Sequence, residues 1–223
     1  MHPLRLRFKK CGRAKYISHL DLMRAFTRAV RRADLPLWYT EGFHPHVFLS
    51  FPLPLPLGQE SLCEAVDLRL ESPVPPDEIA ARMQTACPEG ITIVSAGEPW
   101  CAAGEIAQAV YDIAFTFENP RIAEVWLAQA EDLLRAGELT AVKTGKQGRR
   151  KVQKEIALAP MIAACAFERA DCFVRCRGTF AAGSEKNLNP VLLCEALNQN
   201  ALAPIKRDIV RTALLKSDGD TWE

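Results

Sequence analysis

Apolar residues along this chain predict the same order of strands and helices twice, once in each half. In the first half, Leu4, Leu6 and Phe8 alternate with charged residues, a period typical of a half-buried strand. Ser18 is followed three residues later by Asp21, a spacing close to a capping box, which predicts that a helix begins there. A repeated order of this kind restricts the fold strongly, because each amphipathic helix must cover the apolar face of a sheet.

The two halves predict matching sets of elements. After the first strand, we expect a helix from Ser18 that ends by Pro36, a strand near 37–40 or 47–51, a strand across 63–70, a helix over 76–87 and a strand at 91–94. In the second half, we expect a strand at 111–117, a helix over 120–135, strands near 138–143, 151–158 and 171–177, a helix over 190–199 and a strand over 205–214. The third strand of this half is ambiguous. Each half reads βαββαβ, so the predicted fold class is α+β, with two tandem ferredoxin-like units.

The predicted boundary between the units lies where Gly97, Pro99 and Gly104 interrupt the pattern. We therefore predict a first unit over 1–98, a linker over 99–108, a second unit over 109–217 and a polar tail over 218–223. The two halves share no sequence identity that would prove a duplication.

The composition is that of an ordinary globular protein. The chain has 223 residues, of which 48% are hydrophobic and 25% are charged. No apolar run reaches the roughly 20 residues needed to cross a bilayer, and the first residues lack the apolar region of a secretory signal. The eight cysteines are scattered rather than arranged as a disulfide framework. We therefore expect a cytoplasmic protein with reduced thiols and no membrane partner.

Positive charge is concentrated in two segments. Residues 1–33 hold ten Lys or Arg and one acid, and residues 143–154 hold six Lys or Arg and no acid. The rest of the chain is therefore acidic, since the whole chain carries only +1. Such segregation produces a directional field that steers a polyanion, although two independently solvated basic surfaces would also explain it.

Three sets of basic residues are candidates for binding nucleic acid. Arg5, Arg7 and Lys9 alternate with the apolar residues of the first strand, so they should line the sheet face that the helices leave uncovered. The aromatic stacking pair of an RNA-recognition motif is missing from this strand. The other candidates are Arg24, Arg28, Arg31 and Arg32 on the helix, and Lys146, Arg149, Arg150 and Lys151 in a basic hairpin loop. We expect the helix arginines to lie opposite an apolar stripe formed by Leu20, Met23, Phe26 or Thr27, Val30 and Ala33.

Conspicuous motifs are confined to residues 4–70. They read Arg-x-Arg-Phe-x-Lys-x-Gly, Tyr-Ile-Ser-His-Leu-Asp-Leu-Met-Arg, Glu-Gly-Phe-His-Pro-His, Pro-Leu-Pro-Leu-Gly-x-Glu-Ser and Glu-x-x-Asp. This pattern resembles the uncharacterised family of radical-SAM-linked proteins, a domain of unknown function found beside or fused to radical SAM proteins. The motif positions are Ser18, His19, Asp21, Gly42, Phe43, Pro45, His46 and Glu64. One departure is His44, where the family usually has Asn. The resemblance implies a radical SAM protein as partner but no settled activity.

The imidazoles are the only candidates for catalysis. His19, His44 and His46, with Asp21, Glu64 or Asp67, are residue types that bind metals. Imidazole also titrates near neutral pH and serves as a general acid or base in phosphodiester cleavage. Alternatively, His19 donates to a backbone carbonyl and His46 packs or contacts phosphate. The departure at His44 argues against a metal or catalytic role for that residue, so we assign no metal site, no cofactor and no confident catalytic residue.

A radical SAM cluster is not expected in this chain. Cys172 and Cys176 have the first spacing of Cys-x3-Cys-x2-Cys, but position 179 is Thr. Because Cys172, Val174 and Cys176 share one strand face, both cysteines are expected in the core. The familiar fingerprints of nucleotide-binding loops, zinc proteases and serine hydrolases are also missing.

These observations favour a non-catalytic RNA-binding accessory module that acts with a separate radical SAM protein, in RNA modification or processing. The RNA would be structured, such as tRNA or rRNA. One alternative is a metal-independent endoribonuclease that uses His19 or His46. Another is a protein-only adaptor whose basic face contacts an acidic surface of the radical SAM partner.

Overall fold

The computed structural model describes residues 1–147, 150–183, 185–198 and 202–222, without the side chains of 143–147 and 150–153. Two compact units are found, one formed by Met1–Ile106 with Val210–Glu223 and one by Ala107–Ile209. The division differs from the predicted one at the C-terminus, because the second half of the last strand and the segment after it belong to the first unit. Each unit is described by itself.

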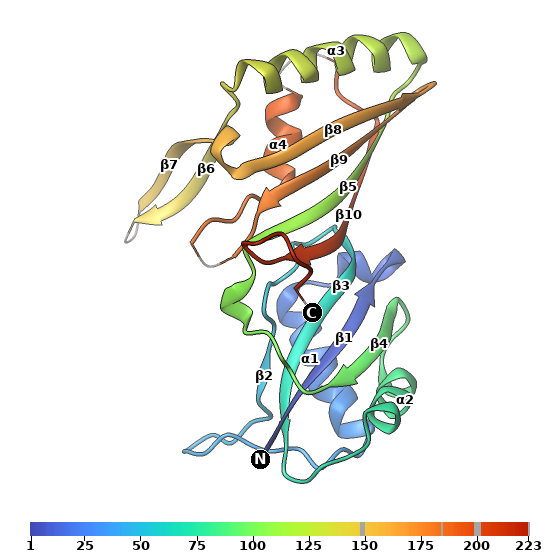
Figure 1. Ribbon diagram of the computed structural model, residues 1–223, viewed down its shortest axis with the longest axis vertical. Coiled ribbons are helices and arrows are strands. Elements are labelled where there is room, and N and C mark those ends of the chain that lie inside the picture. Colours follow the sequence, from blue (N-terminus) through green and yellow to red (C-terminus); the bar gives the residue numbers. More distant parts are fainter. Residues whose placement is uncertain (148–149, 184, 199–201, 223) are drawn as a thin grey trace. The chain divides into compact units, whose positions relative to one another are not determined.

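The first unit contains its elements in the predicted order. They are β1 (His2–Lys10), α1 (His19–Arg32), β2 (Leu49–Ser50), β3 (Glu60–Leu70), α2 (Pro76–Ala86) and β4 (Ile91–Gly97), joined by the later part of β10 (Lys206–Leu215). β1 lies between β4 and β3 and is antiparallel to both. β2 is antiparallel to β3, whereas β10 is parallel to it. The arrangement is visible in Figure 1.

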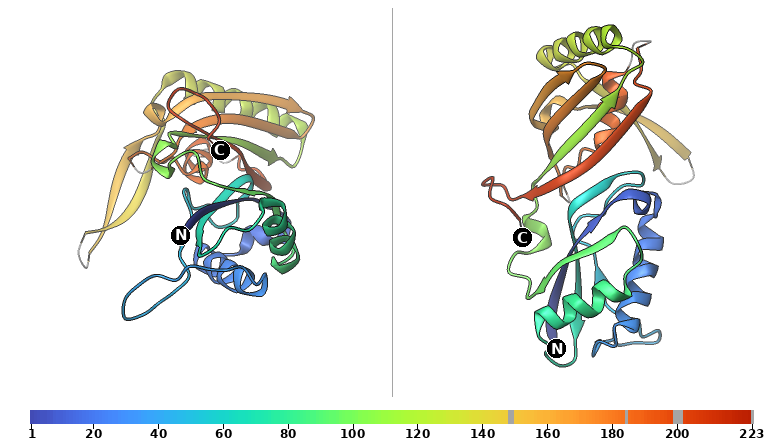
Figure 2. Two further views of the ribbon diagram at one scale, coloured as in Figure 1. Left: turned by 60° about the horizontal axis from the view of Figure 1, so that its bottom comes forward. Right: turned by 90° about the vertical axis from the view of Figure 1, so that its right-hand side faces the viewer.

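The apolar side of β1 forms the centre of the core of this unit, as its alternation predicted. Leu4, Leu6 and Phe8 are buried in one cluster with residues of both helices, namely Leu22, Phe26, Ala29 and Val30 of α1 and Ile79 and Met83 of α2. The helices therefore cover the face of the sheet to which Leu4, Leu6 and Phe8 point, and α1 runs along that side in the right panel of Figure 2. Neither α1 nor α2 covers the opposite face, which carries the odd-numbered residues of β1.

The expected apolar stripe of α1 was wrong at one end. Leu20 is 56% exposed, and Leu22 is buried in its place. Leu20 lies four residues before Arg24, and residues four apart share one face of a helix. Leu20 therefore lies on the arginine side of α1, and the core contacts come from Leu22, Phe26, Ala29, Val30 and Ala33.

The second unit contains β5 (Gln108–Thr116), α3 (Pro120–Ala136), β6 (Thr140–Gln147), β7 (Arg150–Ala157), β8 (Ile162–Ala170), β9 (Phe173–Ala181), α4 (Pro190–Leu197) and the first part of β10. β9 is antiparallel to both β5 and β8. β6 and β7 form a separate two-stranded sheet. The strand β8 was not predicted from the sequence. β8 contains four alanines in nine residues, which gives a weak strand signal because alanine is depleted in strands.

The segment predicted as a polar tail is packed against the first unit. Trp222 is buried, and its indole Nε1 donates a hydrogen bond to the carbonyl oxygen of Ala102, 2.8 Å away. Its backbone amide also bonds the carbonyl of Leu214. The segment predicted as a polar tail therefore contains one buried aromatic residue, Trp222, whose ring packs on the unit.

The helices within the described ranges are all too short or too polar to cross a membrane.

Candidate functional site

The solvent side of α1 carries four arginines. The helix begins at the predicted position, since the hydroxyl of its N-cap Ser18 accepts a hydrogen bond from the amide of Asp21, 3.2 Å away. Arg24, Arg28, Arg31 and Arg32 are all exposed on the side away from the sheet. α1 therefore presents these cations together because its other side is held in the core.

These four arginines differ in their contacts within the unit. Arg24 forms an ion pair with Asp21 at 3.1 Å, and Arg32 donates to the carbonyl of Ala86 at the end of α2. The hydrogen bond from Ser18, and next Arg24, lower the pKa of Asp21. For the guanidinium groups of Arg28 and Arg31, no hydrogen bond or ion pair is found in the part of the chain that the structure describes. These two arginines are the ones most open to an external anion.

The sequence assigned Arg5 to nucleic-acid binding, and its position argues against that role. Its guanidinium binds both carboxylate oxygens of Asp67, at 2.7 and 2.9 Å, directly across the β1–β3 pair. It also lies 4.2 Å from the centre of the Trp222 ring, and the residue is only 4% exposed. A buried arginine whose guanidinium is paired with a carboxylate along one edge and stacked on a ring is held in place, which argues against its charge being offered to a phosphate.

The uncovered sheet face contains a small pocket beside Arg5. Its volume is about 230 Å³, and it is lined by Arg5, Arg7, Ser95, Ala96, Gly97, Glu98 and Trp100. Arg7 is half-buried, and the Trp100 ring at the pocket is 73% exposed. The sequence showed that β1 lacks the aromatic stacking pair of an RNA-recognition motif, but it did not indicate that the segment after β4 brings an aromatic ring to this pocket.

Lys9 is exposed on β1, whereas its neighbour Lys10 is buried. The ammonium of Lys10 donates to the carbonyl of Ile17 at 2.9 Å. Burial lowers the pKa of Lys10, and the nearby Glu64 opposes this effect. Lys10 was not singled out from the sequence, although it falls in the same even-numbered phase of the strand as Leu4, Leu6 and Phe8.

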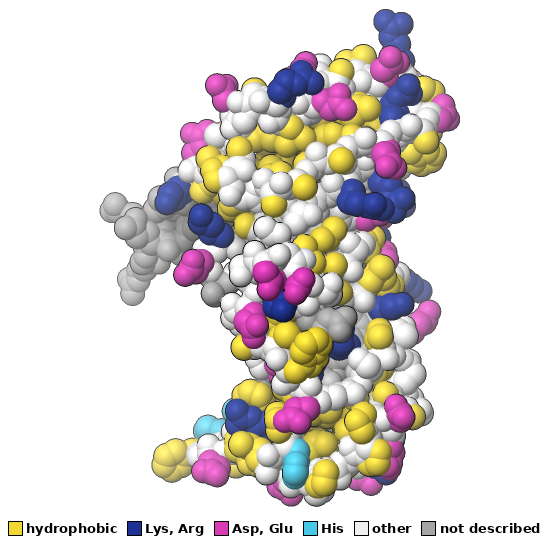
Figure 3. All heavy atoms as spheres, viewed as in Figure 1, with side chains coloured by type: hydrophobic (Ala, Val, Ile, Leu, Met, Phe, Trp, Pro, Cys, Tyr) yellow, Lys and Arg dark blue, Asp and Glu magenta, His cyan; other side chains and the backbone are white. Residues whose placement is uncertain are grey.

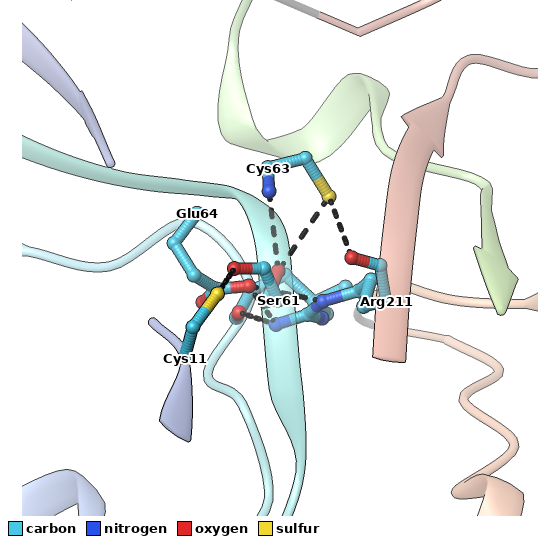
Figure 4. Close-up of polar contacts among 6 residues, drawn as sticks. Cys11, Ser61, Cys63, Glu64 and Arg211 are labelled. Atoms are coloured by element: carbon cyan, nitrogen blue, oxygen red, sulfur yellow. Dashed lines mark hydrogen bonds and ion pairs between the residues drawn. The ribbon is translucent and has the colours of Figure 1, made fainter. Parts of the chain in front are cut away.

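The motif residue Glu64 lies in a buried ion pair. Its Oε1 atom accepts hydrogen bonds from Nε and Nη2 of Arg211, at 3.0 and 2.6 Å. Arg211 also donates to the carbonyl of Leu53, and the thiol of Cys63 donates to the carbonyl of Arg211 (Figure 4). Glu64 and Arg211 are 3% and 1% exposed. Glu64 is therefore an internal partner of Arg211 and does not face a ligand.

The Gly42–His46 motif forms the tip of a loop. The Nδ1 atom of His46 lies 3.0 Å from both the Thr40 hydroxyl and the His44 carbonyl oxygen, and backbone bonds join Thr40 to His46. The ring of Phe43 at this tip is fully exposed. His46 thus closes the turn through contacts with its own loop, and its predicted contact with phosphate stays a prediction.

His19 and His46 occupy different surroundings. His19 is half-buried with its ring edge-on to Phe51, and its Nδ1 atom has no hydrogen-bond partner within the described chain. Among the described residues, no group of three or more His, Cys, Asp or Glu side chains is placed to hold a metal ion. The Nδ1 atom of His19 therefore makes no hydrogen bond to a backbone carbonyl within the described residues, and a bond through its other ring nitrogen stays a prediction.

The second unit carries a pair of arginines that the sequence did not single out. Arg175 and Arg177 are exposed on β9 and line a pocket of about 130 Å³ with Ala166 and Glu168. Arg175 is paired with Asp112 of β5, with 2.7 Å between Nε and Oδ1. The alternation of buried Val174 and Cys176 with these arginines could have indicated them. Cys176 is in the core as expected, whereas Cys172 is only half-buried.

The basic hairpin was the third predicted site. Its strands pair β6 with β7, with Lys146 opposite Lys151 and Gln147 opposite Arg150. Arg149 and the side chains of Lys146, Arg150 and Lys151 lie outside the described residues. Their proposed contacts with nucleic acid stay a prediction.

The first unit therefore carries cations on two opposite sides, one on α1 and one on the uncovered sheet face. On the molecular face seen in Figure 3, basic, acidic and hydrophobic side chains are all exposed, so positive charge there is not continuous. One RNA strand could contact both Arg7 and Arg28 only if its phosphate backbone passed around the unit. The strand and helix arginines therefore lie on different sides of this unit and do not form one surface.

A family model described as "Uncharacterized protein conserved in bacteria (DUF2344)" matches residues 3–190. None of the curated proteins matches the chain. Among solved structures, a chain in "Crystal Structure of a Cbf5-Nop10-Gar1 Complex" is similar over 96% of this chain and 50% of that one, with a TM-score of 0.49 and 9% identity. This chain thus spans about half the length of the chain that it matches.

Proposed function

The chain belongs to the uncharacterised bacterial family DUF2344, and we propose that it is an RNA-binding accessory module that acts with a separate radical SAM protein. The RNA-binding role in this proposal rests on the solvent side of α1. Arg28 and Arg31 are exposed there, and Asp21 is the only acidic residue of the helix. The radical SAM partner comes from the motif resemblance of residues 4–70.

The length of this arginine surface suits a phosphate backbone. Arg24 and Arg31 are seven residues apart, which corresponds to about 10 Å along a helix. A nucleic-acid duplex carries one charge per roughly 1.7 Å of axis, so about six phosphate charges pass along such a distance. An RNA with a structured backbone, as in tRNA or rRNA, therefore offers several contacts at once.

The sheet arrangement supports an interpretation of both units as ferredoxin-like. In the first unit β1 lies between β3 and β4, and β2 adds to β3, which is the order expected from βαββαβ. In the second unit the corresponding strands are β8, β9, β5 and β10, with the β6–β7 hairpin inserted. Such units leave one sheet face uncovered, and many sheet-based RNA-binding proteins use that face.

The endoribonuclease alternative has less support in the geometry. Nδ1 of His46 is within hydrogen-bonding distance of atoms of its own loop, and His19 is half-buried against Phe51. A general base must lie within hydrogen-bonding reach of the group it deprotonates, and neither imidazole is among the residues that line the pocket at Arg7.

The test is binding of structured RNA to the full-length protein over a series of salt concentrations. The logarithm of affinity should fall linearly with the logarithm of salt, by roughly 0.7 per phosphate contact for a single strand. The double substitution Arg28→Ala with Arg31→Ala should flatten that slope by about 1.4, because two contacts are lost. Arg121→Ala, which removes an exposed arginine from α3, is the matched control and should leave the slope unchanged.

Three outcomes separate the hypotheses. Retention of intact RNA with the expected change in slope supports the module. Defined cleavage products that disappear in His19→Ala or His46→Ala would establish the nuclease instead. No RNA affinity even at low salt would contradict the proposal and leave the protein-only adaptor.

A further inference from the structure

The motif at 42–46 forms the tip of an arm, residues 38–48, that projects from the first unit (Figures 1 and 2). The ring of Phe43 at this tip is 101% exposed, so neither of its faces packs on the protein. The arginines of α1 give this motif no role. We propose that Phe43 stacks on unpaired bases of the RNA whose backbone lies along those arginines; this inference rests on the proposed function.

Hydrogen bonds hold the tip of the arm in one shape. Nδ1 of His46 lies 3.0 Å from the Thr40 hydroxyl and from the His44 carbonyl oxygen. The amide of His46 also donates to the Thr40 hydroxyl at 3.1 Å, and the amide of Thr40 donates to the carbonyl of His46. Gly42 has a φ of +122°, a backbone conformation that other residues rarely adopt. Because the turn is already formed, binding requires little further ordering of the chain.

The stem of the arm is packed on the rest of the unit. Tyr39 and Val47 form an antiparallel bridge across the arm, and Val47 is buried in the core. The guanidinium carbon of Arg69 in β3 lies 5.3 Å from the centre of the Trp38 ring and 4.4 Å from the centre of the Phe48 ring. Cation–π contacts of this kind are attractive. The stem therefore fixes the direction in which the arm presents its tip to solvent.

The arm begins close to the end of α1. Arg31 lies in the last turn of the helix, and the segment 33–37 joins the helix to the arm. A connection of this length spans at most about 20 Å, even when it is fully extended. A hairpin RNA can therefore place its paired stem on the arginines and the unpaired bases of its loop at Phe43.

The small size of the apolar surface favours a base over a protein partner. At the tip, Phe43 is flanked by Gly42 and His44. A protein interface buries about 800 Å² on each partner around an apolar core, whereas a single aromatic side chain buries about 150–250 Å². One ring is nevertheless enough to stack a base, and unpaired RNA bases are commonly bound on aromatic side chains. Because both faces of Phe43 are open, the ring can also enter between two bases.

The experiment measures binding of the full-length protein to two fluorescein-labelled RNAs by fluorescence anisotropy. One is an RNA hairpin with an unpaired adenosine loop, and the other is a blunt RNA duplex with the same number of phosphates. Phe43→Ala should weaken binding of the hairpin about tenfold, because stacking on an aromatic side chain contributes substantially per base. The affinity for the duplex should stay unchanged, since its bases are paired and unavailable to the ring.

The salt dependence separates this contact from those of the arginines. Phe43→Ala removes no charge, so the slope of the logarithm of affinity against the logarithm of salt should stay as in the wild type. Arg28→Ala with Arg31→Ala should flatten that slope for both RNAs. Phe43→Trp should keep the affinity for the hairpin. Phe173→Ala is the matched control, because it removes an exposed phenyl ring from the second unit. Circular dichroism should show that each variant is folded, since both rings are exposed.

The outcomes distinguish this inference from the proposed function. If both RNAs bind with the expected salt slope but Phe43→Ala binds the hairpin like the wild type, stacking is refuted, the RNA-binding role of α1 stands and the ring is left to a protein partner. An equal loss for the hairpin and the duplex would also overturn the inference, because the contact would not depend on unpaired bases. If neither RNA binds at low salt, both proposals fail. A loss confined to the hairpin, with an unchanged slope, supports the inference.

Discussion

The buried pair between Glu64 and Arg211 gives a stability prediction with a defined magnitude. Replacing Glu64 with Gln keeps the shape of the side chain but removes the negative charge that faces Arg211. Nε and Nη2 of Arg211, which lie 3.0 and 2.6 Å from Oε1 of Glu64, would then face either the neutral amide oxygen or the amide nitrogen of the glutamine. The ammonium of Lys10 would also lose the nearby anion that favours its charged form. The substitution therefore leaves cations in a buried region with no carboxylate to balance them.

The expected cost follows from burial. Removing one partner of a buried ion pair destabilises a protein by about 3–5 kcal/mol, because the remaining charge is left without compensation. Total stabilities are only about 5–15 kcal/mol, so Glu64→Gln should lower the midpoint of urea denaturation substantially. Fluorescence and circular dichroism should both be recorded, because the two units can unfold in separate transitions.

The chain offers a matched control. Asp132 and Arg135 form an ion pair on the surface of α3, with side chains that are 72% and 75% exposed. Asp132→Asn removes the same charge and should cost at most about 0.5 kcal/mol, since water screens exposed pairs. A loss for Glu64→Gln as small as that of the control would refute the reasoning. A double variant, Glu64→Gln with Arg211→Met, should recover part of the stability by removing the orphaned cation.

Two further predictions follow from burial. Leu22→Ala should destabilise the first unit by about 2–5 kcal/mol through lost core packing, whereas Leu20→Ala should change stability by less than about 0.5 kcal/mol; equal effects in urea denaturation would contradict the observed helix face. Desolvation raises the pKa of the Cys63 thiol to about 11, so at pH 8 Cys63 should be alkylated by iodoacetamide much more slowly than Cys172, which is equally half-buried, and the two should react equally fast in urea. Mass spectrometry of peptides measures both rates, and rapid native labelling of Cys63 would argue against its raised pKa.

The sequence predicted most of the elements because their signals are local. The alternation in β1, the N-cap Ser18 and the prolines at the starts of α2, α3 and α4 each act within a few residues. These features placed the starts of the helices within about one residue of the observed ones. Local signals failed for β8, because an alanine-rich strand is stabilised by its pairing with β9 and not by its own residues.

The phase of α1 shows where a local pattern becomes ambiguous. Leu20 and Leu22 are both apolar, and either could begin an apolar stripe. The arginines at positions 24, 28 and 31 decide between them, since Leu20 shares a face with Arg24 and Leu22 does not. The correct phase was therefore present in the sequence, but it required the charged and apolar residues to be placed on one helix together.

The sequence by itself determined the order of the elements, the core side of β1 and the concentration of arginines on α1, because each depends on residues only a few positions apart. Only the tertiary structure decided which charges remain available. Arg5 is neutralised by Asp67, 62 residues away, and Glu64 by Arg211, 147 residues away. Trp222 and Trp100 reach the neighbourhood of Arg5 through segments that carry no periodic signal. The position of a charged residue in the sequence does not indicate which residue will pair with it, because pairing depends on the strand register and on where the chain ends pack. Its burial and neutralisation are therefore decided only when the fold brings distant segments together.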